Sequence, residues 1–461
     1  MKACATWSYA PYAPLMWNPG EPYVCRIAPF AGGFTCQWLP TSGEGEYIVR
    51  CAPRGEALQE VGRTKDCAFT LRGLEDHRDY AFQISRENRA SRLRLVRTGE
   101  AVGTVVNYLH PQDDCYSFSG SALCSPSLLR LPDGALLASM DVFASAAPQN
   151  LTLIFRSEDD GRTWNYACEL MPCFWGRLFF HRGAVYMLAC STEYGDLLIA
   201  RSDDGGRSFC APTALLRGAG RVNAAGVHKN PQPPVYYAGR LWETLEWGAW
   251  ALGGHAAMVM SAPENADLLD PASWVFSEPL PYDPAWPGTA QGPSAGCIEG
   301  CLTIDPRGRL VNVMRYDMSR CTPNYGRALV FRVDTDHPEN PLIYQRAMAF
   351  PGNHSKFEIR RDPVSGRYFS IVSRILDAGN SNSRNLLSLI ASRDLSEWNL
   401  VCDLQDFRRE DPAQVGFQYV DFFFEGDDLV YLCRTALNGA HNYHDANYST
   451  FHRLPHFRDL L

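Results

Sequence analysis

The sequence has no cluster of lysine or arginine and no long apolar segment. Its 43 basic residues are outnumbered by 51 acidic ones, which gives a formal net charge of −8. Binding to nucleic-acid phosphates requires clustered positive charge, so we expect no nucleic-acid partner. A membrane-spanning helix needs a run of about eighteen or more apolar residues. No such run occurs, so we expect a globular protein without a membrane partner.

The start of the chain lacks the basic segment and the continuous apolar stretch of a secretory signal, so we expect a cytoplasmic location. The sixteen cysteines are scattered through apolar segments, for example at Cys190 and Cys433, where cysteine is usually a small buried hydrophobe. Cys297 and Cys301 have no second Cys/His pair at zinc-finger spacing. We therefore predict neither a metal nor a cofactor, and the oligomeric state stays open.

Residues 1–100 contain short alternating segments separated by turns, which is the pattern of a β-sandwich. A chain of 461 residues is too long for one core, so we assign 1–100 to one domain and 101–461 to another. Trp38, Leu74 and Tyr80 resemble the fibronectin type III pattern, in which the Trp fills the core and the Tyr closes a corner. Such a domain serves either as a packing domain or as a sugar-binding module.

From about residue 120 the chain repeats a unit made of an apolar strand, a tight glycine turn and a second apolar strand. Six copies occur, roughly fifty to seventy residues apart, which suits a four-stranded blade with its loops. The repeats predict an all-β chain, with a six-bladed β-propeller after the sandwich. The turn glycines are Gly134, Gly183, Gly239, Gly308, Gly366 and Gly426.

A second motif recurs at Ser157–Trp164 and Ser202–Phe209, with a worn copy at Ser392–Trp398. These segments resemble the Asp-box, or BNR repeat, of sialidases. Ser and Asp side chains can bond the backbone of a tight turn while Gly supplies the unusual dihedral angle, so we expect a structural role. The resemblance implies a sialidase-like propeller over residues 104–461.

The last repeat ends after its third strand, and almost no chain remains for a fourth. A closed ring needs every strand edge covered. We therefore predict that residues 104–110 supply the outer strand of the last blade and close the ring as a clasp.

A ligand site is expected over the central channel, on the face opposite the glycine turns. Near the upper end of the second strand of each repeat, five of the six positions are charged. Isolated buried charges are costly, so these groups either pair with one another and plug the channel or receive a charged ligand. The six positions are Asp141, Cys190, Glu246, Arg315, Arg374 and Arg434.

Glu299 and Arg315 stand at the spacing Glu-x8-Gly-x6-Arg found in sialidases. The resemblance implies that Glu299 assists a tyrosine nucleophile and that Arg315 grips the carboxylate of the substrate. Two positions depart from the family, because Cys124 stands in place of the first arginine and Phe417 in place of the tyrosine. Tyr419 lies two residues further on and would face the same side of the strand.

A polar loop near the end of the chain could protonate a leaving oxygen, abstract a sugar proton or bind a metal. A loop tied only by its own polar side chains is the alternative. Two further segments enter the same region from neighbouring blades. The loop residues are His441, His444, Asp445, Asn447 and Tyr448, and the other segments contribute His228, Lys229, His354 and Lys356.

We predict an exo-acting glycosidase whose carbohydrate substrate is an acidic or acid-substituted sugar. Asp141 or Glu246 would be the general acid or base, and Glu299 the nucleophile or its activator. The predicted catalytic residues are Asp141, Glu246, Glu299, Tyr419, His441 and His444, and the predicted substrate-binding residues are Arg315, Arg374, Arg434, His228, Lys229, Lys356, Asp445 and Tyr448.

Two alternatives belong to other classes. A lyase on uronic-acid sugars would use His441 or His444 with Tyr448 to remove the proton next to a carboxylate that Arg has neutralised. A carbohydrate-binding propeller would bind sugar without turning it over, because a fold does not fix a function.

Overall fold

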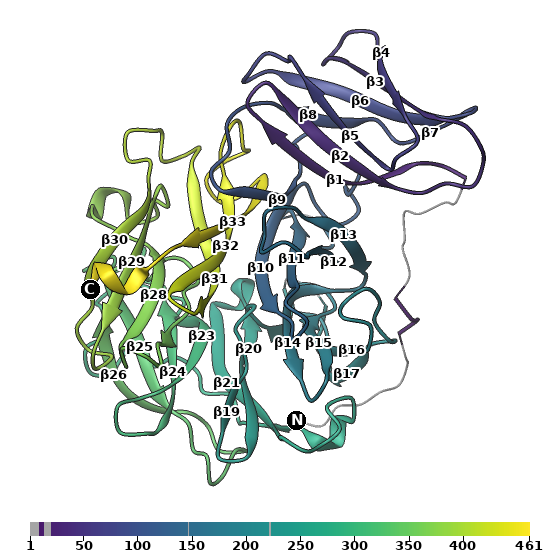
Figure 1. The fold of residues 1–461 in the computed structure, drawn as a ribbon. Helices are drawn as coiled ribbons and strands as arrows, with labels where there is room; N and C mark the ends of the chain where they lie inside the picture. The colour runs from purple at the N-terminus through teal and green to yellow at the C-terminus, as the bar shows by residue number, and fades with distance from the viewer. Residues whose placement is uncertain (1–8, 13–19, 146, 221–222) are drawn as a thin grey trace.

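The computed structural model describes residues 9–12, 20–145, 147–220 and 223–461. A small body of two sheets, purple in Figure 1, stands on one side of a larger body built from the rest of the chain. Strands dominate both bodies. Within the described residues the helices are four short 3-10 turns, namely η1 (Trp250–Leu252), η2 (Pro271–Ser273), η3 (Ala378–Asn380) and η4 (Phe457–Leu460).

The small body is a β-sandwich, as predicted. Trp38 is buried in its core, and the Tyr80 hydroxyl accepts a hydrogen bond from the Glu75 backbone N–H at 2.9 Å, which fixes a corner. The fibronectin type III assignment stays a prediction. One sheet contains β1 (Tyr23–Phe30), β2 (Gly33–Leu39) and β5 (Ala68–Arg72), and the other contains β4 (Gln59–Thr64), β3 (Tyr47–Pro53), β6 (Asp79–Arg86), β7 (Arg89–Ala90) and β8 (Arg94–Arg97).

The large body consists, over the described residues, of six antiparallel sheets of four or five strands. The first has β10 (Ala122–Arg130), β11 (Leu136–Phe143), β12 (Leu151–Ser157) and β13 (Asn165–Leu170), and the second has β14 (Phe174–His181), β15 (Ala184–Cys190), β16 (Leu197–Ser202) and β17 (Thr213–Leu216). The third has β18 (Gly226–His228), β19 (Val235–Tyr237), β20 (Arg240–Ala249), β21 (Gly254–Pro263) and β22 (Val275–Phe276). The fourth has β23 (Cys297–Ile304), β24 (Leu310–Tyr316), β25 (Arg327–Arg332) and β26 (Ile343–Ala349), and the fifth has β27 (Arg360–Arg361), β28 (Tyr368–Ser373), β29 (Leu386–Ser392) and β30 (Asn399–Asp406). The sixth has β31 (Gly416–Glu425), β32 (Asp428–Ala436), β33 (Tyr448–Leu454) and β9 (Thr104–Tyr108).

Apolar contacts join these sheets into a ring. Each sheet shares a buried apolar cluster with the next one along the chain. A further cluster joins the last sheet to the first, where Val430 and Leu432 pack with Leu128 and Leu136. Because the contacts return to their starting point, the sheets surround a common axis and their first strands lie innermost.

Strand β9 closes the ring. It pairs antiparallel with β33, with Tyr108 opposite Tyr448 and Thr104 opposite Phe451. The predicted clasp is therefore confirmed, and Figure 1 shows β9 running from the sandwich to the edge of the last sheet.

The sandwich is anchored to this clasp. The Arg26 guanidinium donates to the backbone oxygens of Val106 and Val105, at 2.7 and 2.8 Å. A buried ion pair of 2.7 Å between Arg94 and Asp113 ties β8 to the segment that follows the clasp. These contacts fit a packing role for the domain.

The glycine turns and Asp-box turns lie at the end of the ring opposite the upper strand ends. All six turn glycines have φ between +58° and +90°, a region that other residues rarely adopt. In the first Asp-box turn, the Ser157 hydroxyl accepts from the Gly161 N–H at 2.9 Å, and the Asp159 carboxylate accepts from the Thr163 N–H at 2.8 Å. These side chains are satisfied by their own turn.

The fifteen cysteines within the described ranges are free, and most are buried. Over the same ranges, no helix has the length and apolar character needed to cross a bilayer.

Candidate active site

A cavity of about 340 Å3 opens where the upper strand ends of the ring converge. Residues from the first, second, third, fourth and sixth sheets line it. Five sheets therefore contribute side chains to one cavity, on the face opposite the glycine turns.

Backbone bulges direct four side chains into this cavity. The pairing of the innermost strands β10, β14, β23 and β31 with their neighbours shifts register near the upper end of each strand. At these shifts, Ser125, Trp175, Glu299 and Tyr419 have φ between +49° and +55°, and all four line the cavity. Such a conformation costs on the order of 1–3 kcal/mol in a non-glycine residue and clusters at functional sites. The same distortion in four separate sheets marks this cavity as the candidate site.

Glu299 and Tyr419 form the centre of the site. The Tyr419 hydroxyl donates to Glu299 Oε1 at 2.5 Å, and the Arg315 guanidinium donates to Glu299 Oε2 at 2.6 Å and to the Tyr419 oxygen at 3.2 Å. Burial alone would raise the pKa of Glu299, but Arg315 and the bond from Tyr419 hold that pKa below its ordinary value. Burial and the charge of Glu299 raise the pKa of Tyr419 to about 12. An ionised carboxylate thus faces a protonated phenol.

Three guanidinium groups surround that phenol. Arg384 and Arg434 stand over the Tyr419 ring, 5.9 and 5.1 Å from its centroid, and Arg315 contacts its oxygen. Among the described residues, the Nε atom of each of the three arginines is buried without a hydrogen-bond partner. Glu299 is the carboxylate that pairs with one of them. The site therefore carries an excess of positive charge.

Arg434 stands beside Cys124, the position where the resemblance to sialidases predicts an arginine. Cys124 of β10 and Arg434 of β32 line the same cavity, and β10 packs against β32. Burial and Asp141 raise the pKa of the Cys124 thiol to about 12, and the charge of Arg434 opposes that rise.

Glu193 adds a second carboxyl group to the cavity wall. It lies in the loop that follows β15 and accepts a hydrogen bond from the Gln149 amide at 3.3 Å. Burial raises the pKa of Glu193 above its ordinary value. His228 lies nearby on the wall, with its ring 4.2 Å from that of Trp175. A carboxyl group whose pKa is raised by burial thus lines the same cavity as the Glu299–Tyr419 pair.

Asp141 and Glu246, the predicted general acids, lie behind the cavity wall. Asp141 is fully buried and accepts from the Thr152 hydroxyl at 2.5 Å and from the Trp175 N–H at 2.6 Å, and burial raises its pKa to about 7. Glu246 is also fully buried and accepts from the Gly300 N–H at 3.0 Å, while its other oxygen lies 2.6 Å from His228 Nδ1. Both carboxylates hold the backbone next to a bulge, and neither lines the cavity. This placement suits a supporting role, and their role as general acid stays a prediction.

Arg374 points away from the cavity. Its guanidinium bonds Ser388 at 3.0 Å and Asp403 of the outer strand β30 at 2.8 Å. The prediction counted residues from the turn glycine and assumed that Arg374 belongs to the strand. In the structure β28 ends at Ser373, one residue before Arg374. Arg384, in the loop before β29, supplies the guanidinium in its place.

Lys229 and Lys356 lie inside the central channel, below the cavity. Both side chains are fully buried. The Lys229 ammonium donates to the Asn230 oxygen at 2.8 Å and lies 3.9 Å from Glu243. The Lys356 ammonium donates to the Val420 oxygen at 3.1 Å. Neither lysine lines the cavity, so this placement suits a role in packing, and their contact with substrate stays a prediction.

The polar loop near the end of the chain is divided between two environments. His444 lines the cavity and lies 2.8 Å from Asp445, and burial lowers the pKa of His444 to about 4, so its ring is neutral near pH 7. His441 is exposed and pairs with the same carboxylate at 2.9 Å. Tyr448 is buried in the clasp, with its ring 4.8 Å from that of Tyr108. In the part of the chain that the structure describes, no group of three or more His, Cys, Asp or Glu side chains is arranged to hold a metal ion.

The sequence reasoning missed Arg384, Glu193 and Trp175. Arg384 lies in a loop rich in Ser and Asn, where no repeat marks a position. Glu193 lies three residues past Cys190, so extending the strand-end count into the following loop would have reached it. Trp175 enters the cavity because of a bulge, which no residue pattern announces.

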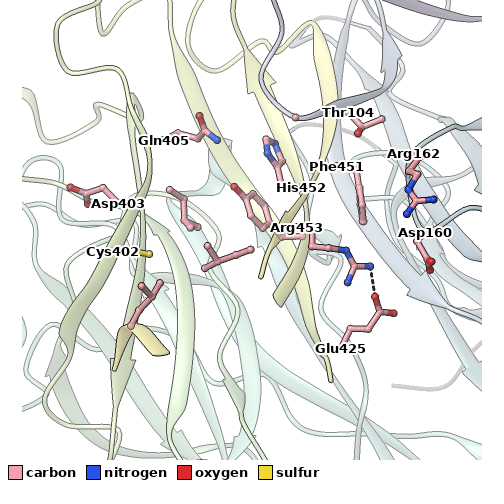
Figure 2. A pocket seen from close by; sticks show the side chains of 16 residues that line it. Thr104, Asp160, Arg162, Cys402, Asp403, Gln405, Glu425, Phe451, His452 and Arg453 are labelled. Atoms are coloured by element: carbon pink, nitrogen blue, oxygen red, sulfur yellow. Dashed lines mark hydrogen bonds and ion pairs between the residues drawn. The ribbon is translucent and has the colours of Figure 1, made fainter. Parts of the chain in front are cut away.

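A larger cavity of about 1010 Å3 lies along the outer strands, beside the first Asp-box turn. Figure 2 shows Arg453 directed at Glu425, while Asp403 and Gln405 project from the neighbouring sheet. These charges pair within the wall rather than converge on the space. The smaller cavity is therefore the better candidate for chemistry.

Comparisons with known proteins show the fold. No family model and no curated protein matches the chain. Among solved structures, an α-L-arabinanase of Penicillium chrysogenum complexed with arabinobiose is similar at a TM-score of 0.52 and 14% identity, over 78% of this chain and 99% of that chain. A Hadza microbial sialidase is similar at a TM-score of 0.51 and 13% identity, over 96% of this chain and 98% of that one. The chain thus has a sialidase-like propeller fold.

Proposed function

We propose that this protein is an exo-acting glycoside hydrolase that removes an acidic sugar from the end of a carbohydrate chain. The observation that carries the proposal is the contact of Glu299 with both Tyr419 and Arg315. Among the residues that the structure describes, Glu299 is the one carboxylate that forms an ion pair with the three arginines of the cavity. The likeness to an arabinanase and to a sialidase supports hydrolysis of a glycosidic bond.

Tyr419 is the proposed nucleophile. A phenol whose pKa is about 12 attacks poorly unless a base removes its proton during the attack. Glu299 accepts that hydrogen bond at 2.5 Å and is ionised, so it takes the proton while the phenol oxygen bonds the anomeric carbon. Arg315, 3.2 Å from the same oxygen, stabilises the negative charge that develops there.

Glu193 is the proposed general acid and base. In the first step its proton passes to the glycosidic oxygen as the bond to the leaving group breaks. In the second step the Glu193 carboxylate takes a proton from a water molecule as the water oxygen attacks the anomeric carbon. The bond between that carbon and the Tyr419 oxygen breaks. Glu299 then returns its proton to the tyrosine oxygen. Burial raises the pKa of Glu193, which favours the protonated form that the first step requires. Two displacements at one carbon retain its configuration.

Arg384 and Arg434 are the proposed carboxylate grip, together with Arg315. Forked guanidinium groups suit planar carboxylates, and an unbalanced positive charge in a buried site is relieved by an anionic ligand. The lyase alternative is disfavoured because Tyr448 is buried in the clasp and does not line the cavity that His444 lines. Within the same proposal, the six sheets are the blades of the propeller, and the sandwich is a fibronectin type III-like packing domain of a cytoplasmic protein.

A panel of 4-methylumbelliferyl glycosides tests the proposal. We expect turnover of at least one glycoside that carries a carboxylate, such as a sialoside, glucuronide or iduronide, and none of the neutral α-L-arabinofuranoside. Ultraviolet absorbance of the product would reveal a lyase. Turnover of neutral glycosides alone would overturn the acidic substrate, and binding without turnover over a broad panel would favour the non-catalytic alternative.

A further inference from the structure

We infer that Gln418 is a positioning residue that holds Arg384 and Arg434 at the distance a carboxylate requires. The use of these arginines as a carboxylate grip rests on the proposed function. Gln418 itself is fully buried and does not line the cavity, so it acts through the arginines and not on the substrate.

Gln418 stands at the junction of the two arginines. It is the last regularly paired residue of β31 before the bulge that carries Tyr419, and its partner across the sheet is Arg434. The Gln418 amide oxygen accepts a hydrogen bond from Arg384. Gln418 is therefore next to Arg434 through strand pairing and is bound to Arg384 through a side-chain hydrogen bond.

The other end of the Gln418 amide holds the loop that fixes Arg434. Its nitrogen donates to the backbone oxygens of Tyr443 and His444, at 2.7 and 3.2 Å. Arg434 donates to the same His444 oxygen. One amide therefore links Arg384, the loop and Arg434, and among the side chains of similar size this requires a group that both donates and accepts.

The neutrality of this link explains why it is an amide. Burial, together with repulsion from Arg315 and Arg434, lowers the pKa of Arg384 to about 10, so the arginines are costly to hold together. A carboxylate would relieve that cost but would also cancel the charge, as Asp403 does for Arg374. Gln418 fixes Arg384 and leaves its positive charge available for a ligand.

Two variants test the link. Gln418→Met removes all three hydrogen bonds of the amide at similar volume, and Gln418→Glu keeps the acceptor but adds negative charge. For a turned-over acidic glycoside we expect KM to rise about ten-fold or more in both variants, with a smaller change in kcat because the Tyr419–Glu299 pair stays in place. Gln345→Glu, an exposed change on β26, is the matched control and should leave both constants unchanged.

A double-mutant cycle separates positioning from general destabilisation. If Gln418 acts through Arg434, then Gln418→Met should raise KM by a smaller factor in an Arg434→Ala background than in the wild type. Equal costs in the two backgrounds, or an unchanged KM in the single variants, would overturn the inference.

A structural readout keeps the test independent of the proposed activity. A crystal structure of Gln418→Met should show the Arg384 guanidinium displaced and the 441–445 loop shifted, whether or not any substrate is found. Calorimetric titration with glucuronate and N-acetylneuraminate then reports on the grip. Carboxylate binding without turnover would refute the hydrolase while sparing the link, and an unmoved Arg384 would refute the link while sparing the hydrolase.

Discussion

Two groups of buried charge lie on the axis of the ring, and they differ in balance. In the channel, Asp421 pairs with Arg177 and Arg360, and Glu358 pairs with Arg360 and Lys356. Burial opposes the charge of Asp421, but these cations hold its pKa below the ordinary value. The network closes on itself, which is the behaviour of a structural plug.

The cavity above it is unbalanced. Its three arginines contact one carboxylate, and Arg384 and Arg434 bind an amide oxygen and a backbone oxygen instead. If these arginines only stabilised the fold, we would expect them to be paired with carboxylates, as the cations of the channel network are. The contrast teaches that the pairing of buried charges, and not their number, separates a site from a plug.

The largest effect is expected at the reactive pair in the cavity. Tyr419→Phe removes the nucleophile without changing the ring, so turnover should fall about ten-thousand-fold or more while the protein stays folded. The measurement is steady-state hydrolysis of an acidic aryl glycoside, with nuclear magnetic resonance of the first product anomer in the wild type. An inverted anomer, or a variant within ten-fold of wild type, would exclude Tyr419 as nucleophile.

The channel should respond in stability. Asp421→Ala leaves the buried Arg177 without its carboxylate, and breaking a buried pair in this way costs about 3–5 kcal/mol of unfolding free energy. Urea and thermal denaturation measure it. Arg434→Ala is the comparison. Arg434 forms no ion pair with a carboxylate within the described ranges, so this variant should change the midpoint little. Equal losses in the two variants would erase the distinction between plug and site.

The proton balance of the cavity should appear in the pH profile. Glu299 must be ionised and its pKa is lowered, so kcat/KM should decline only on the acid side of the ordinary carboxyl range. Glu193 must be protonated and its pKa is raised, so kcat/KM should decline as pH rises above the ordinary carboxyl range. Glu193→Gln should abolish the alkaline decline and reduce turnover about a hundred-fold for a poor leaving group. An equal loss for a good leaving group such as nitrophenol would argue against an acid role.

The smallest effect concerns Arg434, the arginine beside Cys124. Arg434→Ala should raise KM for an acidic glycoside about ten-fold to a hundred-fold, the value of one charged hydrogen bond. Adding Cys124→Arg to that variant should recover part of the affinity, because Cys124 and Arg434 share one wall. Arg374→Ala, the control, should leave KM unchanged since Arg374 binds Asp403 outside the cavity. No recovery in the double variant would show that the two positions are not equivalent.

Periodic features were predictable from the sequence and local irregularities were not. The glycine turns recur, so the sheets and the β9 clasp could be predicted. The fixed spacing of Glu299 and Arg315 pointed to two residues that the structure brings together in the proposed site. Counting along strands gave height above the turns but not the direction of a side chain. It therefore placed Lys229 in the site when that residue lies in the channel.

Loops and bulges set the remaining part of the site. Arg384 comes from a loop without any repeat. Tyr419 faces the cavity because it lies in a bulge of β31, where its φ is +55°. Phe417, where the resemblance to sialidases predicts a tyrosine, packs in the core against Phe407, with ring centroids 5.1 Å apart. Such shifts of one or two residues depend on tertiary packing, which local sequence does not encode.

The clasp also constrains how the ring can be made. During translation β9 leaves the ribosome hundreds of residues before β33, its hydrogen-bonding partner, exists. The nascent chain must therefore carry a bare strand edge through most of synthesis, and such edges are prone to pair with other chains. The sandwich is complete by then, and its Arg26 holds the carbonyls of Val105 and Val106, which gives the waiting strand a rigid mount on which the last sheet can later be assembled.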